Sequence, residues 1–267
     1  AAAPLPVRVR ATLHRLAPRP LLLAAAAVAV SVALVPLVYL VVRTAGIAAE
    51  QGLDVLVTGR TLELAAHSVA LAAVVTLGCV VLGVASAFLV TRTDLPGRRA
   101  FGVLAALPLA IPSYVAAYTW VAAADLVDRA SRFEGFWAAA LVLTLCSYPY
   151  VFLPTAAALV GADPATEEVS RSLGRGGWRT FTGVTLRQIR PAVAAGALLV
   201  ALYVLSDFGA VAILRADTFT RAIFVYFDLG LSRPALALAT VLVALTVVVL
   251  AAESTTRRRG ARLTRPG

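Results

Sequence analysis

The chain has 267 residues, of which 60% are hydrophobic and 14% are charged, and its mean hydropathy is +0.88. Soluble domains contain about 45–50% apolar and about 25% charged residues, so this composition excludes an ordinary soluble protein and indicates an integral membrane protein. The 24 basic residues are all arginines, and the net charge is +10. Because a phosphate-binding P-loop requires a lysine, any ATP-driven activity needs an ATPase on another subunit.

Six apolar stretches are long enough to cross the hydrocarbon core of a bilayer, which takes about 20 helical residues. Continuous apolar runs differ from the alternating strands of a membrane barrel, so we predict an all-α bundle of six transmembrane helices. The first run is too long for a signal-peptide core, and we expect it to be retained. The expected domain of residues 21–252 has spans at 21–42, 64–90, 101–124, 136–160, 192–214 and 234–252, between a basic segment (1–20) and a basic tail or linker (253–267).

The arginines are distributed unevenly between the two ends of these spans. Seventeen of the 24 lie in residues 8–19, 92–99, 171–190 and 257–265, and seven lie in the alternate connections. By the positive-inside rule the richer side is cytoplasmic, so we predict that both termini and the connection at 161–191 are inside. Membrane topology therefore explains the positive charge, and we expect lipid and no nucleic acid as a partner.

The connection at 161–191 is the one organised polar segment of the chain. Asp163 before Pro164 is a typical helix start, Glu167 and Arg171 have the i, i+4 spacing of an ion pair, and Gly174 is a typical helix stop. The short helix predicted between them carries a largely apolar strip formed by Ala165, Val169, Ser172 and Leu173.

A second amphipathic stretch follows from Trp178 until Pro191, which we expect to open the fifth span. Its apolar strip is formed by Phe181, Val184, Leu186 and Ile189. Two interpretations are open: a loop adsorbed on lipid headgroups through its arginines, or a coupling helix that sits in a groove of a soluble motor. The sharp glycine turn favours the second, because adsorption on lipid would not require it.

Prolines interrupt the third and fourth predicted spans. Such prolines free backbone carbonyls and bend a membrane helix, either for packing alone or because the two spans flank a translocation path. In the second case Tyr114 and Tyr118, spaced i, i+4, would share one face of the third span. The prolines are Pro108, Pro112, Pro149 and Pro154.

Asp207 is the one acidic residue well inside a predicted span, which makes it a functional candidate. It follows Pro191 by sixteen residues, so a helix would place it about 24 Å away, near the outer mouth. Two roles would explain an aspartate at this position. It could act in the translocation path or in docking, or it could form a structural hydrogen bond to a neighbouring span.

We expect no metal site and no catalytic centre in this chain. His14 and His67 are far apart, and we find neither at ligand spacing from a cysteine or carboxylate; His67 is expected to be a polar packing contact. Cys79 and Cys146 fall inside predicted spans, where packed thiols are expected. The outer connections mix acidic and basic residues, so their charge does not select a cation, and docking of a partner protein explains the mixture equally well.

The polar segment resembles the EAA loop of ABC-importer permeases. That motif has a glutamate, a glycine six positions later, an aliphatic residue, a leucine and prolines. Other segments, namely RTDLPGRR (92–99), PLAIPSYVAAYTWV (108–121), SYPYVFL (147–153), SRSLGRGGWRTF (170–181) and VLSDFG (204–209), are similar to the ferric-iron branch of these permeases. The matching positions of the EAA motif are Glu168, Gly174, Val184, Leu186 and Pro191.

The resemblance implies a type I permease subunit in a bacterial inner membrane, importing ferric iron by alternating access. A substrate-binding protein would dock outside, and partner ATPase subunits would bind ATP and Mg inside, with no cofactor in this chain. The resemblance and the apolar strip together give the expected ATPase-coupling residues: Glu167, Glu168, Val169, Ser172, Leu173, Gly174, Val184, Leu186 and Pro191. The candidate path residues are Tyr114, Tyr118, Tyr203 and Asp207.

The chain departs from the family pattern at several positions. Val169 and Ser170 replace the usual alanines, Arg187 stands where a proline commonly follows the leucine, and Tyr203 stands where relatives often have an acidic residue. Thiamine, a polyamine or a phosphonate are therefore alternative cargoes, and an ion-gradient-driven secondary transporter is the alternative class. Since six helices form only half of such a permease, we expect the chain to pair with a copy of itself or with a second half, and to be the first half of a longer permease.

Overall fold

The structure, a computed structural model, describes residues 20–51, 58–127 and 132–263. Every described element is a helix, which confirms the predicted all-α class. The α-helices are α1 (Pro20–Gln51), α2 (Gly59–Arg92), α3 (Arg98–Ala106), α4 (Ser113–Val127), α5 (Phe136–Ser147), α6 (Pro149–Gly161), α7 (Pro164–Ser172), α8 (Gly177–Thr180), α9 (Leu186–Ser206), α10 (Gly209–Ile213), α11 (Phe219–Asp228) and α12 (Ser232–Leu263). A 3-10 turn, η2 (Leu107–Ala110), follows α3, and a π-helical turn, η3 (Phe181–Thr185), joins α8 to α9.

Five described helical segments are long and apolar enough to cross a membrane, and a bent pair can supply a sixth. The bent pair is the predicted third span, in which Arg98–Ala110 and Ser113–Val127 meet at 97°. Pro112 explains the break, because the residue before a proline is driven out of the helical region; Ile111 is extended, with ψ 117°. The predicted kink is thus a full break, and residues 101–124 form no straight span.

The fifth predicted span differs from the expectation at both ends. Its helix begins in the polar segment at Gly177 and runs through η3 to Ser206, so Pro191 lies inside α9 and does not open the span. The region predicted as the outer connection 215–233 contains the additional helix α11. Helix α12 continues to Leu263, beyond the predicted end of the sixth span at residue 252.

The centre of the bundle is formed by α2, α6 and α9, which make the most extensive contacts with one another. Glycines allow these helices to approach closely, as is common in membrane helix packing. A Cβ added at Gly83 of α2 would lie 2.9 Å from the backbone nitrogen of Phe152, and one at Gly196 of α9 would lie 2.7 Å from the carbonyl oxygen of Tyr150. Helix α6 is therefore held between two glycine-bearing surfaces.

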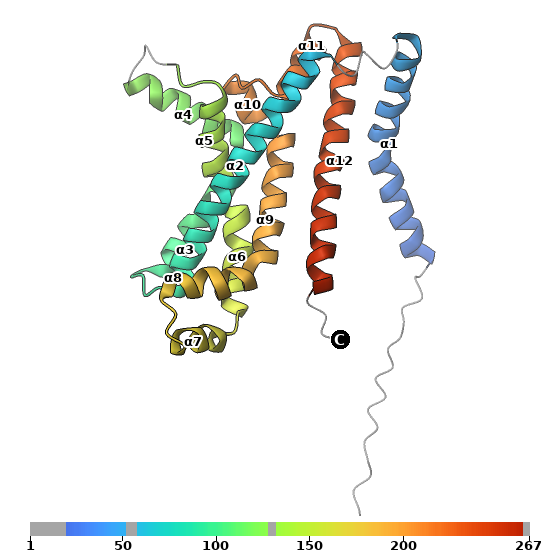
Figure 1. Cartoon of the computed structure of the whole chain (residues 1–267). Coiled ribbons are helices and arrows are strands. Elements are labelled where there is room, and N and C mark those ends of the chain that lie inside the picture. Colours follow the sequence, from blue (N-terminus) through green and yellow to red (C-terminus); the bar gives the residue numbers. More distant parts are fainter. Residues whose placement is uncertain (1–19, 52–57, 128–131, 264–267) are drawn as a thin grey trace, which may run out of the picture.

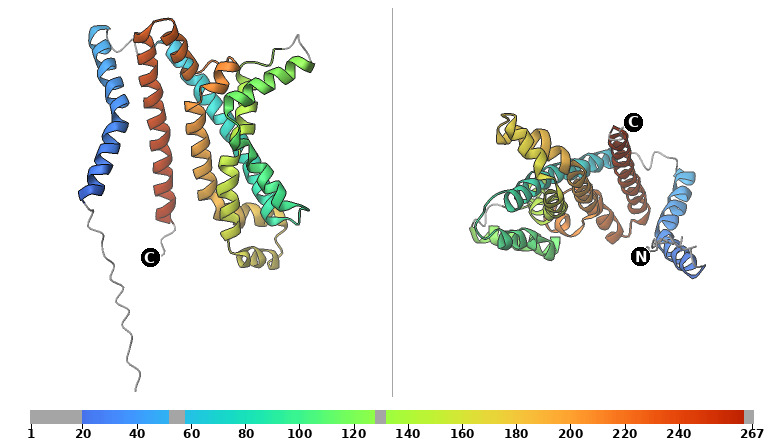
Figure 2. Two further views of the ribbon diagram at one scale, coloured as in Figure 1. Left: turned by 180° about the vertical axis from the view of Figure 1, so that it is seen from behind. Right: turned by 90° about the horizontal axis from the view of Figure 1, so that it is seen from below.

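The bundle has two distinct ends (Figure 1), called here the foot, which carries α7, and the head, which carries α10 and α11. Helix α1 stands at one edge beside α12 (Figure 2), where Thr44 Oγ1 lies 2.7 Å from Thr240 Oγ1. The first residue of α1 and the last of α12 both lie at the foot. The described arginine-rich connections gather there too, as predicted, whereas the basic segment before residue 20 lies outside the described residues.

Candidate functional site

Helix α7 forms where the sequence predicts it. The Asp163 carboxylate accepts a hydrogen bond from the Ala165 backbone N–H at 2.9 Å, and Pro164 occupies the first turn. The helix ends at Ser172, and Gly174 adopts a left-handed φ of +78°, which favours glycine because it has no Cβ. The predicted start and stop of the short helix are both confirmed.

One face of α7 is fastened to the helical segment that becomes the fifth span. Thr185 Oγ1 donates to Glu167 Oε1 at 3.0 Å, and Gln188 Nε2 donates to Thr166 Oγ1 at 2.7 Å. The third contact joins the buried hydroxyls of Ser170 and Thr180, 3.1 Å apart. Three side-chain contacts along one face make α7 and this segment a single unit.

Glu167 does not form the predicted pair with Arg171. Its Oε1 lies 3.4 Å from Nη2 of Arg92, the last residue of α2, and its side chain is only 12% exposed. The same Arg92 nitrogen donates to the Leu159 carbonyl of α6 at 3.0 Å. Of the residues predicted for ATPase coupling, Glu167 thus faces the bundle and connects three elements.

Exposed apolar side chains lie on α7, at its C-terminal end and on α8. Val169 on α7 is 58% exposed, Leu173 at the end of α7 is 75% exposed, and Trp178 on α8 is 76% exposed. The other predicted coupling residues differ in their exposure to solvent. Glu168, Ser172, Gly174 and Pro191 are exposed, whereas Val184 and Leu186 are half-buried. We call Val169, Leu173 and Trp178 the foot patch.

At the head, Asp207 joins several helices. Its carboxylate accepts hydrogen bonds from the Ser113 hydroxyl of α4 at 2.6 Å and from the Ala210 N–H of α10 at 3.0 Å. Its backbone carbonyl accepts a hydrogen bond from the Thr220 hydroxyl of α11 at 2.8 Å. These contacts support the structural role considered for this buried aspartate.

Of the other three candidate path residues, Tyr203 lies beside Asp207, because its hydroxyl is within hydrogen-bonding reach of the Ser113 and Asp207 side chains. Tyr114 and Tyr118 lie on α4, and both are exposed. Tyr203 is half-buried on α9, and its ring centroid lies 5.6 Å from that of Tyr150. Tyr150, which belongs to the SYPYVFL segment, was not among the predicted path residues, although its ring lies against that of Tyr203.

The structure corrects one expectation about histidine. Glu63, His67 and Asp217 place one potential ligand atom each within 4.8 Å of one another, and Glu63 and His67 are spaced i, i+4. However, Arg60 donates to the Glu63 carboxylate at 2.9 Å and to the Asp217 carboxylate at 2.7 Å. We therefore describe the group as an ion-pair network that fastens α2 to the segment before α11.

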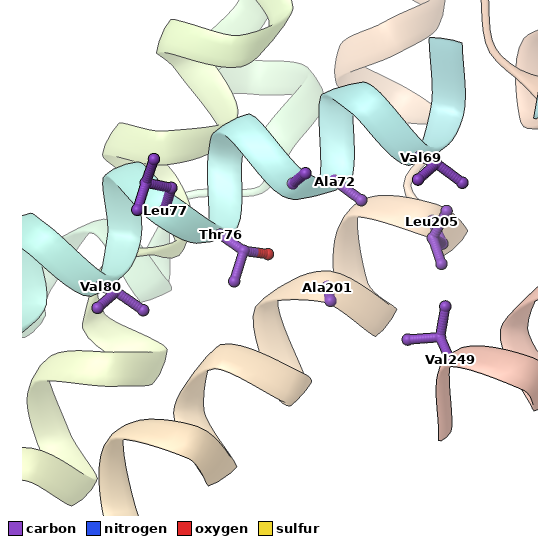
Figure 3. Close-up of a pocket in the computed structure, with 9 residues that line it drawn as sticks. Val69, Ala72, Thr76, Leu77, Val80, Ala201, Leu205 and Val249 are labelled. Carbon is purple, nitrogen blue, oxygen red and sulfur yellow. The ribbon is translucent and has the colours of Figure 1, made fainter. Parts of the chain in front are cut away.

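A cavity of about 390 Å³ opens between α2, α9 and α12 (Figure 3). Its lining is almost entirely aliphatic, and Thr76 supplies its one side-chain oxygen. Binding an ion in such an environment would leave its charge without compensation. This cavity is therefore unsuited to an ionic cargo.

An all-α membrane bundle with one broken span and a fastened polar helix at its foot has the architecture of a type I ABC-importer permease. It is similar to a chain of the MetNI methionine ABC transporter in an inward-facing conformation (TM-score 0.62, 17% identity, 76% of this chain and 99% of the other). It is also similar to a chain of a bacterial ABC transporter involved in alginate import (TM-score 0.63, 16% identity, 92% and 96%). Residues 79–253 match the family described as the binding-protein-dependent transport system inner membrane component. The chain belongs to this family.

Curated relatives carry different cargoes. The chain is 35% identical over 219 residues to the Fe(3+)-transport system permease protein FbpB 2 of Haemophilus influenzae, covering 82% of this chain and 42% of that relative. It thus spans less than half of that relative's length. Identity is 28% over 201 residues to the sulfate permease protein CysT of Escherichia coli (68% and 71% covered). It is 27% over 222 residues to the molybdate/tungstate permease protein WtpB of Thermococcus kodakarensis (78% and 86%).

Proposed function

We propose that this chain is the membrane-spanning permease subunit of an ABC importer in a bacterial inner membrane, with its foot in the cytoplasm. The observation that carries this proposal is the foot patch, together with the family membership. Helix α7 is fastened to the bundle by side-chain contacts, and exposed apolar side chains lie on it (Val169), at its end (Leu173) and on α8 (Trp178), which suits a rigid docking element. The partner would be an ATPase subunit that holds ATP and Mg.

The transport pathway would lie between this chain and a second permease half. The apolar cavity beside Thr76 cannot solvate an ion, so it supplies no route through one bundle. A substrate-binding protein would dock at the head, where arginines and acidic residues form ion pairs. Arg60 and Arg221 pair with Asp217, and Arg215 pairs with Glu134. Docking and ATP binding would then bias the same two-state bundle from opposite ends.

We propose ferric iron as the cargo, supported by the 35% identity to the Fe(3+) permease protein. Oxyanions are the second candidate, because the sulfate and molybdate/tungstate permeases are also similar. Uptake of radioactive ferric iron, sulfate and molybdate, each measured in cells with and without the gene for this chain, separates the candidates. Iron uptake that is the same in both strains would overturn the iron proposal.

The docking proposal is tested by co-purifying the chain with the ATPase subunit expressed beside it. Leu173→Glu should abolish retention of the ATPase, because it places a charge in an apolar interface, yet the amount of inserted protein should not change since the side chain is exposed. Leu126→Glu is the matched control, because Leu126 is 87% exposed on α4, away from the foot patch. Retention of the ATPase by Leu173→Glu would contradict docking at the foot patch. An unmodified chain that retained no ATPase would contradict the proposed function itself.

A further inference from the structure

Arg92 ends α2, the longest of the helices that the structure describes, at the point where three elements meet. Its Nη2 contacts Glu167 of α7 at 3.4 Å and the Leu159 carbonyl of α6 at 3.0 Å. Glu167 also accepts a hydrogen bond from Thr185, in the π-helical turn before α9. The Glu167 carboxylate of α7 thus contacts the end of α2 and the turn before α9, and Arg92 extends this contact to α6.

The opposite end of α2 is fastened at the head. Arg60 pairs with Asp217, and Ser68 Oγ accepts a hydrogen bond from the Phe219 N–H at the start of α11. The 34 residues of α2 span roughly 50 Å at 1.5 Å per residue. Helix α2 is therefore a continuous rod between the foot and the segment before α11.

Of the guanidinium nitrogens of Arg92, Nη2 alone forms the contact with Glu167. Nη2 serves both the carboxylate and the Leu159 carbonyl, whereas Nε is buried and has no hydrogen-bond partner among the described residues. Arginine pairs with a carboxylate most strongly through two parallel N–H donors. A small displacement of α7 toward α2 would convert this contact into a two-donor pair through Nε and Nη2.

We infer that Arg92, Glu167 and Thr185 form a positioning junction that transmits motion of α7 into α2 and α6 as well as into α9. The inference rests on the proposed function, since the motion arises when an ATPase binds the foot patch. Coupling requires an element that both sites bias, and α2 meets this requirement because it reaches both ends of the bundle. Glu167 and Arg92 act here by orienting α7, without contacting cargo.

The test uses the complete complex in proteoliposomes, with the partner ATPase and the binding protein encoded beside this chain. The measured quantity is the ratio of ATPase rates with and without the loaded binding protein. The variants are Glu167→Gln, Arg92→Gln, their combination, and Thr185→Val, which removes only the hydroxyl donor. Arg99→Gln and Asp94→Asn are matched controls, because both side chains are exposed at the foot near Arg92.

Each charge variant should lower the ratio by about 10-fold, within the usual range of coupling between sites, while ATPase retention stays close to that of the unmodified complex. The double variant should lose no more than either single one, because the two residues act as a pair. Thr185→Val should lower the ratio in the same direction, and Thr185→Ser should restore it. These two keep the test decisive if a charge variant accumulates poorly.

Several outcomes would contradict the inference that Arg92, Glu167 and Thr185 transmit motion of α7. One is an unchanged ratio in Glu167→Gln and Thr185→Val. Another is an equal loss in the Arg99→Gln control, and a third is loss of ATPase retention in step with the ratio. An unmodified complex without any bound ATPase would instead refute the proposed function.

Discussion

Single residues at the head determine how the broken third span is held. The Ser113 hydroxyl and the Asp207 carboxylate are both buried and lie 2.6 Å apart. Ser113→Ala should lower the free energy of unfolding by about 1–3 kcal/mol, because it removes the donor to a buried carboxylate. Thermal unfolding of the detergent-purified chain measures this loss. Ser206→Ala is the control, because Ser206 is exposed and its hydroxyl donates to the Tyr203 carbonyl of its own helix; an equal effect of both variants would contradict the prediction.

Asp207→Asn distinguishes the two roles considered for the aspartate. Ser113 and Ala210 donate to different oxygens of the carboxylate, so an amide in the same orientation keeps the acceptor for only one of these two donors. A structural role predicts that thermal stability and transport fall together. Transport that falls while the thermal midpoint stays unchanged would instead place the carboxylate in the path.

Residue pairings were only partly predictable from the sequence. The cap at Asp163 and the glycine stop at Gly174 depend on near neighbours, and both were predicted correctly. Glu167 has Arg171 at helical spacing, yet the structure pairs it with Arg92, which is 75 positions away in the sequence. A buried partner at close range outweighs an exposed i, i+4 pair, which contributes only about 0.2–0.5 kcal/mol, and sequence spacing cannot identify such a partner.

At the scale of elements, the contact between α6 and α9 depends on the absence of a side chain at Gly196. A Cβ there would lie 2.7 Å from both the Tyr150 carbonyl oxygen and the Val151 Cα, and these backbone atoms cannot move independently. Gly196→Ala should therefore destabilise the chain by about 1–3 kcal/mol, as overpacking does. Thermal unfolding of the purified variant checks this.

Gly46→Ala is the matched control for that prediction. Gly46 lies on α1, and a Cβ there would meet nothing within 4 Å. Alanine has the higher helix propensity at both sites, by about 1 kcal/mol, so the control should be neutral or stabilising. Equal thermal midpoints for the two variants would show that the contact between α6 and α9 tolerates a methyl group.

The prolines show why the positions of elements were predicted better than their shapes. Pro149 occupies the first turn of α6, where its missing N–H costs nothing, and residues 136–161 still count as one 26-residue span. Pro112 follows an extended residue and accompanies a 97° break. The sequence marks both prolines alike, but Tyr148 before Pro149 stays helical, with ψ −27°, whereas Ile111 before Pro112 is extended.

For the whole molecule, the number and order of apolar segments followed from composition, whereas their arrangement did not. Length and hydropathy located the second, fourth and sixth spans to within about five residues, but the first span ends eight residues later than predicted, the third is broken and the fifth is displaced. They could not show that α2, α6 and α9 form the centre while α1 stands at the edge beside α12. Helices that face lipid and helices that face each other are equally apolar, because lipid offers no contrast in hydrophobicity.

The orientation of the bundle in the membrane is the remaining prediction, and it depends on charge. The foot carries the arginine-rich connections, so the positive-inside rule places it in the cytoplasm. Ser172→Cys on α7 should therefore react with a membrane-impermeant maleimide only after the inner membrane is opened. Asp228→Cys, at the end of α11, should react in intact spheroplasts, because its side chain is exposed at the head.

The unmodified chain serves as the background for this labelling. Cys79 is buried and Cys146 is half-buried, and both lie within spans, so neither thiol should react. Labelling in the reverse pattern would place the head in the cytoplasm. The foot patch would then face away from ATP, and no cytoplasmic ATPase could reach Leu173 or Trp178. The topology experiment thus tests the premise on which both the docking surface and the junction at Arg92 depend.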